Sequence, residues 1–232
     1  MKLYAYCLCA DLDTFESSVS GVSGTAVRAL KIDDVSVLVS DCEAVPPTKE
    51  NALAHAKVVR SVLGQTTPLP LRFGTVTTEQ QLRTFVTTHK LTLAKKLADV
   101  RGCVEMDVKI IWQRSGSDAS QPDETNGPGT AFLKEKQREL GGDKRLAELS
   151  SLLREELGSL IKDESTDLRP SDSTVLAAVF HLVENSKIQQ YREKLAAVLE
   201  KRPELHFMVS GPWPPYSFAN IELEFTSQFG VS

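Results

Sequence analysis

Residues 104–112 read VEMDVKIIW and carry the clearest strand pattern in the chain. Apolar and charged side chains alternate from Val104 to Lys109, which is the period-2 pattern of a strand with one buried face and one wetter face. The segments that follow are predicted to be a helix over 131–162, a short strand over 166–169, a strand over 175–183, a helix from Ser186 that ends at Pro203, and a strand over 205–209. This β-α-β-β-α-β order predicts a ferredoxin-like domain over residues 103–210, with two helices on one face of a sheet.

The first half of the chain predicts a mixed α+β domain over residues 1–102. The expected elements are strands over 3–8, 26–32 and 35–39, a helix over 49–63, an extended run over 71–76, and a helix that carries the apolar residues from Leu82 to Leu97. The acidic pair Asp33-Asp34 predicts a tight hairpin between the second and third strands. The last helix has two candidate capping boxes, Thr77 with Gln80 and Thr78 with Gln81.

Two segments are set apart by their composition. Residues 114–129 read RSGSDASQPDETNGPG, contain no large apolar side chain and are predicted to form a mobile loop. Residues 211–218 read GPWPPYSF, and their three prolines exclude them from a central strand. We therefore expect residues 211–232 to form an extended C-terminal tail that packs back against the rest of the chain. The predicted fold class is α+β, with two domains and this Pro/aromatic tail.

Composition places the chain among ordinary globular proteins. Of its 232 residues, 41% are hydrophobic and 25% are charged, and the formal net charge is −4. This acidic balance argues against a nucleic-acid partner, as do Glu105 and Asp107 on the expected outer face of the first ferredoxin-like strand. No run of about 18 apolar residues is present, which predicts no membrane span. The four cysteines and the N-terminus favour a cytosolic protein with reduced thiols and no signal peptide.

The sequence contains no assembled pattern of catalytic or metal-binding residues. Cys7 and Cys9 lie two apart without a second pair, so we expect buried free thiols. The four histidines are far apart, and we expect His181 and His206 to be neighbours on the sheet face opposite the helices, as a cross-strand pair or a partner contact. The glycine-rich loops that hold nucleotide phosphates are missing. We therefore predict no metal, no cofactor and no catalytic residue.

Arg72 is the one charged residue in the apolar run 71–76, and two interpretations of it stay open. Its guanidinium could hold the carboxylate or phosphate of a ligand. Alternatively, Arg72 could be partly buried and paired with an acidic side chain that braces the domain. The second interpretation is favoured, because no base or nucleophile accompanies the arginine in the sequence.

Four segments together resemble a known family. They are residues 55–59 (HAKVV), 70–76 (PLRFGTV), 104–109 (VEMDVK) and 211–218 (GPWPPYSF). In this order they resemble the gas vesicle protein GvpL/GvpF family, over nearly the whole chain, and the F type is favoured over the L type. The resemblance implies two α+β domains, the second a modified ferredoxin-like one. It also implies a protein that is not an enzyme, because the family has no established catalytic residues.

The resemblance implies a role in gas vesicles, the gas-filled protein shells that give cells buoyancy. A family member is expected to be a minor structural or accessory protein that contacts the shell protein GvpA and other minor vesicle proteins. It is expected to keep GvpA from aggregating at nucleation, and to be found at the gas vesicle, or in the cytoplasm before assembly. The alternative is a small-molecule or nucleotide-binding regulatory domain, which a concave pocket with Arg72 and His55 would favour.

The motif residues are the candidates for contact with a partner. Tryptophan and tyrosine dominate binding hot spots, which favours the tail as a contact surface. The alternative, favoured by the stiffness of the prolines, is that the tail serves internal packing. The candidate residues are Arg72, Phe73, Gly74, Trp213, Pro214, Pro215, Tyr216 and Phe218.

Overall fold

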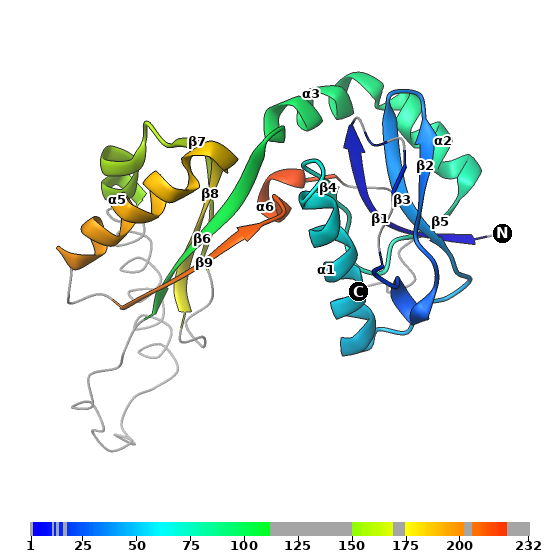
Figure 1. The fold of residues 1–232 in the computed structure, drawn as a ribbon, viewed down its shortest axis with the longest axis horizontal. Coiled ribbons are helices and arrows are strands. Elements are labelled where there is room, and N and C mark those ends of the chain that lie inside the picture. The colour runs from blue at the N-terminus through cyan, green and yellow to red at the C-terminus, as the bar shows by residue number, and fades with distance from the viewer. Residues whose placement is uncertain are drawn as a thin grey trace, which may run out of the picture. The chain divides into compact units, whose positions relative to one another are not determined.

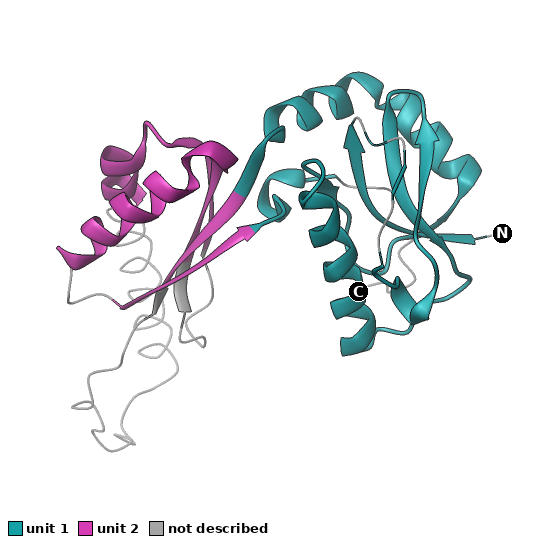
Figure 2. Cartoon of the chain, in the orientation of Figure 1, with its two compact units in different colours: residues 1–104, 213–232 teal, residues 105–212 magenta. Residues whose placement is uncertain are grey.

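A computed structural model of the chain contains two compact units, which Figure 2 colours separately. The structure describes residues 2–10, 12, 14–15, 18–111, 150–168, 175–201 and 206–221. Unit 1 comprises residues 1–104 and 213–232, and unit 2 comprises residues 105–212. The expected loop at 114–129 lies outside the described residues, as does the expected helix before residue 150.

Unit 1 is built on a five-stranded sheet around the long strand β1 (Figure 1). Its strands are β1 (Lys2–Ala10), β2 (Arg28–Ile32), β3 (Val35–Asp41), β4 (Leu69–Pro70) and β5 (Val76–Thr78). They follow the order β2-β3-β1-β4, and β5 also pairs with β1. The predicted hairpin is confirmed, because Ile32 pairs with Val35 across the two-residue turn. Asp33 adopts the left-handed conformation there (φ 51°), which aspartate tolerates better than most residues.

The helices of unit 1 follow their sequence signals closely, with one exception. They are α1 (Lys49–Leu63), α2 (Glu79–Thr88), α3 (Lys90–Val100) and the short α6 (Tyr216–Ala219), with a 3-10 turn η1 (Val22–Gly24). Of the two candidate capping boxes, the one formed is Thr78 with Gln81. The single helix expected through Leu97 is wrong, because the chain leaves the helical region at His89 (φ −102°, ψ 18°). Nδ1 of His89 lies 3.0 Å from the carbonyl oxygen of Phe85, a contact that satisfies the end of α2.

Strand β1 supplies the centre of the core of unit 1. All residues from Leu3 to Cys9 are at most 1% exposed. A β-bulge at Tyr6 interrupts the pairing with β3, since Ala5 pairs with Val39 and Cys7 with Leu38. Cys7 and Cys9 are buried free thiols, as predicted. Burial raises the pKa of Cys9 to about 12 and that of Cys7 as well, so neither thiol is a reactive nucleophile near neutral pH.

Unit 2 contains a four-stranded sheet in the order β7-β8-β6-β9. The strands are β6 (Cys103–Ile111), β7 (Ile161–Leu168), β8 (Val175–Glu184) and β9 (His206–Trp213). Residues 150–157 are helical, and the 3-10 turn η2 (Asn185–Lys187) leads into helix α5 (Ile188–Glu200). The strand predicted from Val104 onward is confirmed as β6, and the strand predicted over 175–183 as β8.

Two strands of unit 2 have other bounds than the sequence predicts. Strand β7 begins at Ile161, where a helix was expected. Its polar sequence IKDESTDL, at the edge of the sheet, has no strong apolar period, so its start could not be predicted from the sequence. Strand β9 continues through Pro212 to Trp213. Proline is tolerated in an edge strand such as β9, which has only one neighbouring strand.

Two expectations about side-chain placement in unit 2 are wrong. His181 and His206 are not neighbours, because β6 lies between β8 and β9 in the sheet. Glu105 and Asp107 do not face water, being 3% and 8% exposed. Burial raises the pKa of Asp107, although its carboxylate oxygen Oδ2 lies 3.3 Å from the hydroxyl of Ser210. The charged side chains at alternate positions of β6 thus do not indicate a solvent-exposed face.

Candidate functional site

The Arg72-Phe73-Gly74 motif forms a turn between β4 and β5, and not the extended run expected from the sequence. The backbone N–H and the hydroxyl of Thr75 both donate to the carbonyl of Arg72, at 3.3 and 2.7 Å. Gly74 has φ 89°, a conformation that strains any other residue, which explains why glycine occupies this position. The turn sends Phe73 toward the core, while Arg72 stays exposed.

Tyr4 and His55 fasten this turn from inside unit 1. The N–H of Gly74 donates to the hydroxyl of Tyr4 at 3.1 Å, and that hydroxyl lies 2.8 Å from Nδ1 of His55. The other ring nitrogen of His55 donates to the carbonyl of Leu71, so in the neutral imidazole Nδ1 accepts the proton of the Tyr4 hydroxyl. Burial lowers the pKa of His55 to about 4 and raises that of Tyr4. His55 is therefore a neutral structural residue at physiological pH.

The substitution Tyr4→Phe tests this bridge. It keeps the ring but leaves the N–H of Gly74 and Nδ1 of His55 without their shared partner. We expect the free energy of unfolding to fall by about 2 kcal/mol, because buried polar groups then lose hydrogen bonds. Urea denaturation measures the change, with Tyr216→Phe at a 41% exposed position as the control. Equal, small losses in both variants would contradict the bridging role of Tyr4.

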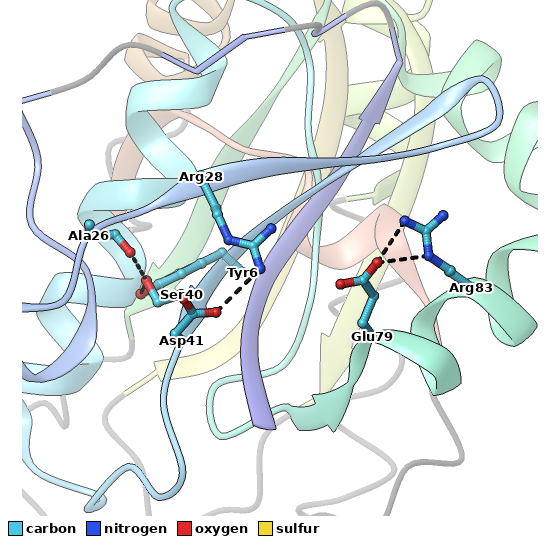
Figure 3. Close-up of polar contacts among 7 residues, drawn as sticks. All are labelled: Tyr6, Ala26, Arg28, Ser40, Asp41, Glu79 and Arg83. Atoms are coloured by element: carbon cyan, nitrogen blue, oxygen red, sulfur yellow. Dashed lines mark hydrogen bonds and ion pairs between the residues drawn. The ribbon is translucent and has the colours of Figure 1, made fainter. Parts of the chain in front are cut away.

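Tyr6 anchors a second loop, the segment before β2. Its hydroxyl accepts from the N–H of Val22 at 2.9 Å and contacts the hydroxyl of Ser40 at 2.9 Å, which in turn donates to the carbonyl of Ala26 at 2.7 Å. Figure 3 shows this chain of contacts from Tyr6 through Ser40 to Ala26. Tyr4 and Tyr6 of β1 therefore each fasten a loop: Tyr4 holds the turn before β5, and Tyr6 holds the segment before β2.

Two ion pairs drawn in Figure 3 belong to the surface of unit 1. Arg28 pairs with Asp41 at 3.3 Å, and Arg83 with Glu79 at 2.7 Å. All four side chains are more than 40% exposed, so each pair contributes at most about 1 kcal/mol. These pairs do not form a site.

The proline-rich segment after β9 departs from the extended path expected of it. The guanidinium of Arg60 on α1 lies 4.9 Å from the ring centroid of Trp213, a cation–π contact. Pro214 and Pro215 are buried, and residues 216–219 turn into helix α6, which contacts β4. Within this segment, Tyr216 is 41% exposed and Phe218 is half-buried.

A cavity of about 510 Å³ lies where the Arg72 turn faces α6. Its walls are residues 70–72 on one side, and Tyr216 with residues 219–221 on the other. The structure thus brings Arg72 and Tyr216 together from positions 144 residues apart (216 − 72). His55 is 4% exposed and does not line this cavity, so the pocket with Arg72 and His55 that would favour a regulatory domain is not formed by these residues.

The expectation that Arg72 pairs with an acidic side chain is not met in the described part of the chain. No ion pair of Arg72 occurs there, and the side chain is exposed. A second cation lies at the cavity: Nζ of Lys96 on α3 donates to the carbonyls of Ala219 and Asn220, at 3.0 and 3.1 Å. The ammonium group thereby satisfies the carbonyls at the end of α6 and adds positive charge beside Arg72.

Sequence reasoning misses a buried polar cluster in unit 2. Glu164 on β7 accepts hydrogen bonds from Ser150 at 2.5 Å and from Arg154 at 2.8 Å. Its other oxygen lies 3.3 Å from Nε2 of His181, and Nδ1 of His181 lies 2.7 Å from the hydroxyl of Tyr191. His181 is fully buried, and burial lowers its pKa against the opposing effect of Glu164. The cluster links two helices to two strands.

One sequence signal could have revealed this cluster. His181 is the only strongly polar residue in the apolar run AAVFHLV of β8, and Glu164 lies directly opposite it. Predicting that Glu164 pairs with His181 requires the register of β7 against β8. The polar sequence of β7 does not show where this strand begins. The contact therefore became visible only in the folded chain.

The described residues contain neither a metal-site cluster nor a membrane-spanning helix. Within that part of the chain, no three His, Cys, Asp or Glu side chains are grouped so that they could hold a metal ion. None of the helices described is both long and apolar enough to cross a bilayer.

The fold and the cavity together define an α+β protein with two sheet-based units and an arginine–tyrosine pocket beside α6. A family model described as gas vesicle synthesis protein GvpL/GvpF matches residues 2–220, and the chain belongs to this family. The family recognised from the four motifs is thereby confirmed.

Relatives of both types match the chain. Gas vesicle protein L1 of Halobacterium salinarum is 28% identical, over 93% of this chain and 89% of its own. Gas vesicle protein F1 of the same organism is 27% identical, over 99% and 98%. These relatives are named as gas vesicle proteins and not as enzymes. The family model establishes the family, and the near-equal identities to L1 and F1 leave the F type a prediction.

Solved structures support the fold class. The crystal structure of the gas vesicle protein GvpF from Anabaena matches with a TM-score of 0.74 at 20% identity, and covers 96% of this chain and 99% of that chain. GvpF from Microcystis aeruginosa matches with a TM-score of 0.73 at 19% identity. The predicted α+β class is confirmed at this level.

Proposed function

We propose that this protein is a minor structural or accessory component of gas vesicles that binds the shell protein GvpA and other minor vesicle proteins during assembly. The observation that carries the proposal is the family match over residues 2–220, nearly the whole chain. The protein acts in the cytoplasm before assembly and then at the gas vesicle.

Physical chemistry gives assembly a need for such a partner. A shell that excludes liquid water needs a strongly apolar inner surface, and free subunits with that surface self-associate. A protein that covers the patch shifts this equilibrium by mass action, by about 2.7 kcal/mol when present at 100 times its dissociation constant. Keeping GvpA from aggregating at nucleation follows from binding alone and requires no chemical step.

We infer that the protein works by binding and not by catalysis. The polar groups of both units support this inference. Tyr4 and His55 hydrogen-bond one another and a turn inside unit 1, while His181 and Glu164 are buried in unit 2. Each set fastens elements of the fold, and buried hydrogen-bonded polar groups of this kind are structural in most proteins.

The finer description of the fold is also a proposal. We propose that unit 2 is ferredoxin-like, supported by its strand order β7-β8-β6-β9 and by α5 between β8 and β9. The domain bounds 1–102, 103–210 and 211–232 stay predictions. Contacts within the chain group residues 213–232 with unit 1, which supports a tail that belongs to the first domain.

Co-expression with GvpA tests the proposed function. We expect soluble GvpA to co-purify with the tagged chain, and deletion of the coding region from a vesicle-forming gene cluster to abolish buoyant vesicles. Trp213→Ala is a poor contact variant because it also removes the packing against Arg60, so Tyr216→Ala is preferred. Normal buoyancy after deletion, together with no capture of GvpA, would sink the proposal. Gold-labelled antibody on intact and collapsed vesicles then locates the protein.

A further inference from the structure

The cavity beside α6 has a charge that nothing in the described part of unit 1 neutralises. Arg72 lines it and makes no ion pair with a described acidic residue. Lys96 lies at the same place, with its ammonium group on the carbonyls of Ala219 and Asn220. None of the described residues that line the cavity is acidic. An anion entering the cavity therefore meets the positive charge of Arg72 and no repelling carboxylate from the described residues of its walls.

The walls of the cavity combine this charge with apolar surface. Leu71 and Ile221 contribute aliphatic groups, and Tyr216 contributes an aromatic ring that is 41% exposed in total. Aromatic and arginine side chains are enriched in binding hot spots. A volume of about 510 Å³ is in the range of sites that hold a few side chains or a small ligand.

The chemistry favours a carboxylate over a phosphate. Phosphate sites gather several cations with converging backbone N–H groups at a helix start. Here one guanidinium is available, because Lys96 already donates to two carbonyls, and α6 presents its C-terminal end. A planar guanidinium matches a planar carboxylate through two parallel hydrogen bonds. Leu71, Tyr216 and Ile221 then offer apolar contacts to the residues that flank such a carboxylate in a peptide.

We propose that this cavity binds a carboxylate carried by an apolar peptide segment of a partner protein, with Arg72 as the charged contact and Tyr216 as the apolar one. The choice of a vesicle protein as the partner rests on the proposed function, whereas the carboxylate chemistry rests on the cavity. The carboxylate belongs either to an aspartate or glutamate side chain or to a chain end.

Peptide titrations of the purified full chain test the site directly. The probes are Ac-Ala-Ile-Glu-Leu-Ala-amide, its Gln counterpart, and Ac-Ala-Ile-Leu with a free C-terminal carboxylate, followed by NMR of the amides at 70–72 and 219–221. We expect the Glu peptide or the free-ended peptide to bind at least about tenfold more tightly than the Gln peptide. Whichever carboxylate peptide binds more tightly identifies the source. Free propionate, a carboxylate without a peptide, is the fourth probe. Equal binding of all three peptides, or binding of propionate and of none of the peptides, overturns the proposal.

Matched arginine variants separate the site from general charge. We expect Arg72→Met to lose about tenfold in peptide affinity and Arg72→Lys to retain part of it. Arg83→Met removes an exposed arginine that pairs with Glu79 on α2 and should bind as the parent does. Equal losses in Arg72→Met and Arg83→Met overturn the proposal. Thermal melting confirms that Arg72→Met is folded, as expected for an exposed side chain.

Co-purification of GvpA with the parent chain and with Arg72→Met distinguishes failure of the proposed site from failure of the proposed function. Peptide binding that depends on Arg72, with no capture of GvpA by the parent chain, supports the site and removes GvpA as the partner. GvpA captured equally by the parent and by Arg72→Met, with no peptide bound, overturns the site and leaves the proposed function standing.

Discussion

Gly21→Ala is expected to lower the free energy of unfolding by about 3 kcal/mol. A Cβ atom at this position would overlap the Tyr6 hydroxyl oxygen and lie 2.7 Å from the hydroxyl oxygen of Ser40. The backbone of Gly21 is ordinary (φ −75°), so the cost arises from space alone. Overpacking of a filled core costs about 1–3 kcal/mol, and displacing Tyr6 also breaks its bond to the N–H of Val22.

Calorimetry of four variants checks this expectation: Gly21→Ala, Gly64→Ala, Tyr6→Phe, and Gly21→Ala combined with Tyr6→Phe. Gly64→Ala is the matched control, because its Cβ would meet only a carbonyl of α1 at 3.5 Å and its φ is −69°. The control should be neutral or slightly stabilising. The double variant Gly21→Ala with Tyr6→Phe removes the hydroxyl that the new methyl group meets, so it should be more stable than the sum of the single losses predicts. Strict additivity would contradict the clash as the cause.

Sequence patterns predict a helix, strand or turn of this chain well where the whole pattern lies within that one element. The hairpin at Asp33-Asp34 follows from a turn between two β-branched runs, and the strand from Val104 follows from alternation. The break at His89 between α2 and α3 lacks a glycine or proline that would mark it. Such a break depends on how both helices meet the sheet, which no window of sequence contains.

The candidate site was predictable in its residues and not in its geometry. The motif PLRFGTV is visible in the sequence, but its turn depends on Tyr4 and His55, which lie 70 and 19 residues before Gly74. Without these contacts the apolar run resembles a strand. The meeting of Arg72 with Tyr216 depends on α6, whose four residues are too few to give a period. Long-range contacts therefore create the cavity.

Acidification is expected to destabilise unit 1 between pH 6.5 and pH 4. The pKa of His55 is about 4 in the folded chain because burial disfavours its charged form, and about 6.5 in the unfolded chain. Between these values the unfolded state binds a proton that the folded state excludes. The stabilisation is therefore fully present above pH 6.5 and is lost as the pH falls. The loss reaches about 3 kcal/mol near pH 4.

The environment of His55 argues for the same direction. Tyr4 donates to Nδ1, so protonation at that nitrogen would take away the acceptor of the hydroxyl proton, while the hydroxyl oxygen still accepts from the N–H of Gly74. Phe73 packs edge-on to the imidazole with ring centroids 6.0 Å apart, and this apolar contact offers no counter-charge. His181 in unit 2 adds a loss of the same sign, since burial also lowers its pKa.

Urea denaturation from pH 7.5 to pH 4 measures this dependence, and NMR of the labelled imidazoles reports which ring titrates. His55→Gln keeps an acceptor and a donor at the site, so it should be less stable at pH 7.5 but lose less stability on acidification. His206→Gln alters an exposed histidine and should follow the parent curve. Protonation of His55 near pH 6.5 in the folded chain would contradict this prediction, because the folded and unfolded states would then bind the proton equally well. A neutral ring down to about pH 4 would instead mark the Tyr4–His55 bridge as the acid-sensitive point of the turn that carries Arg72.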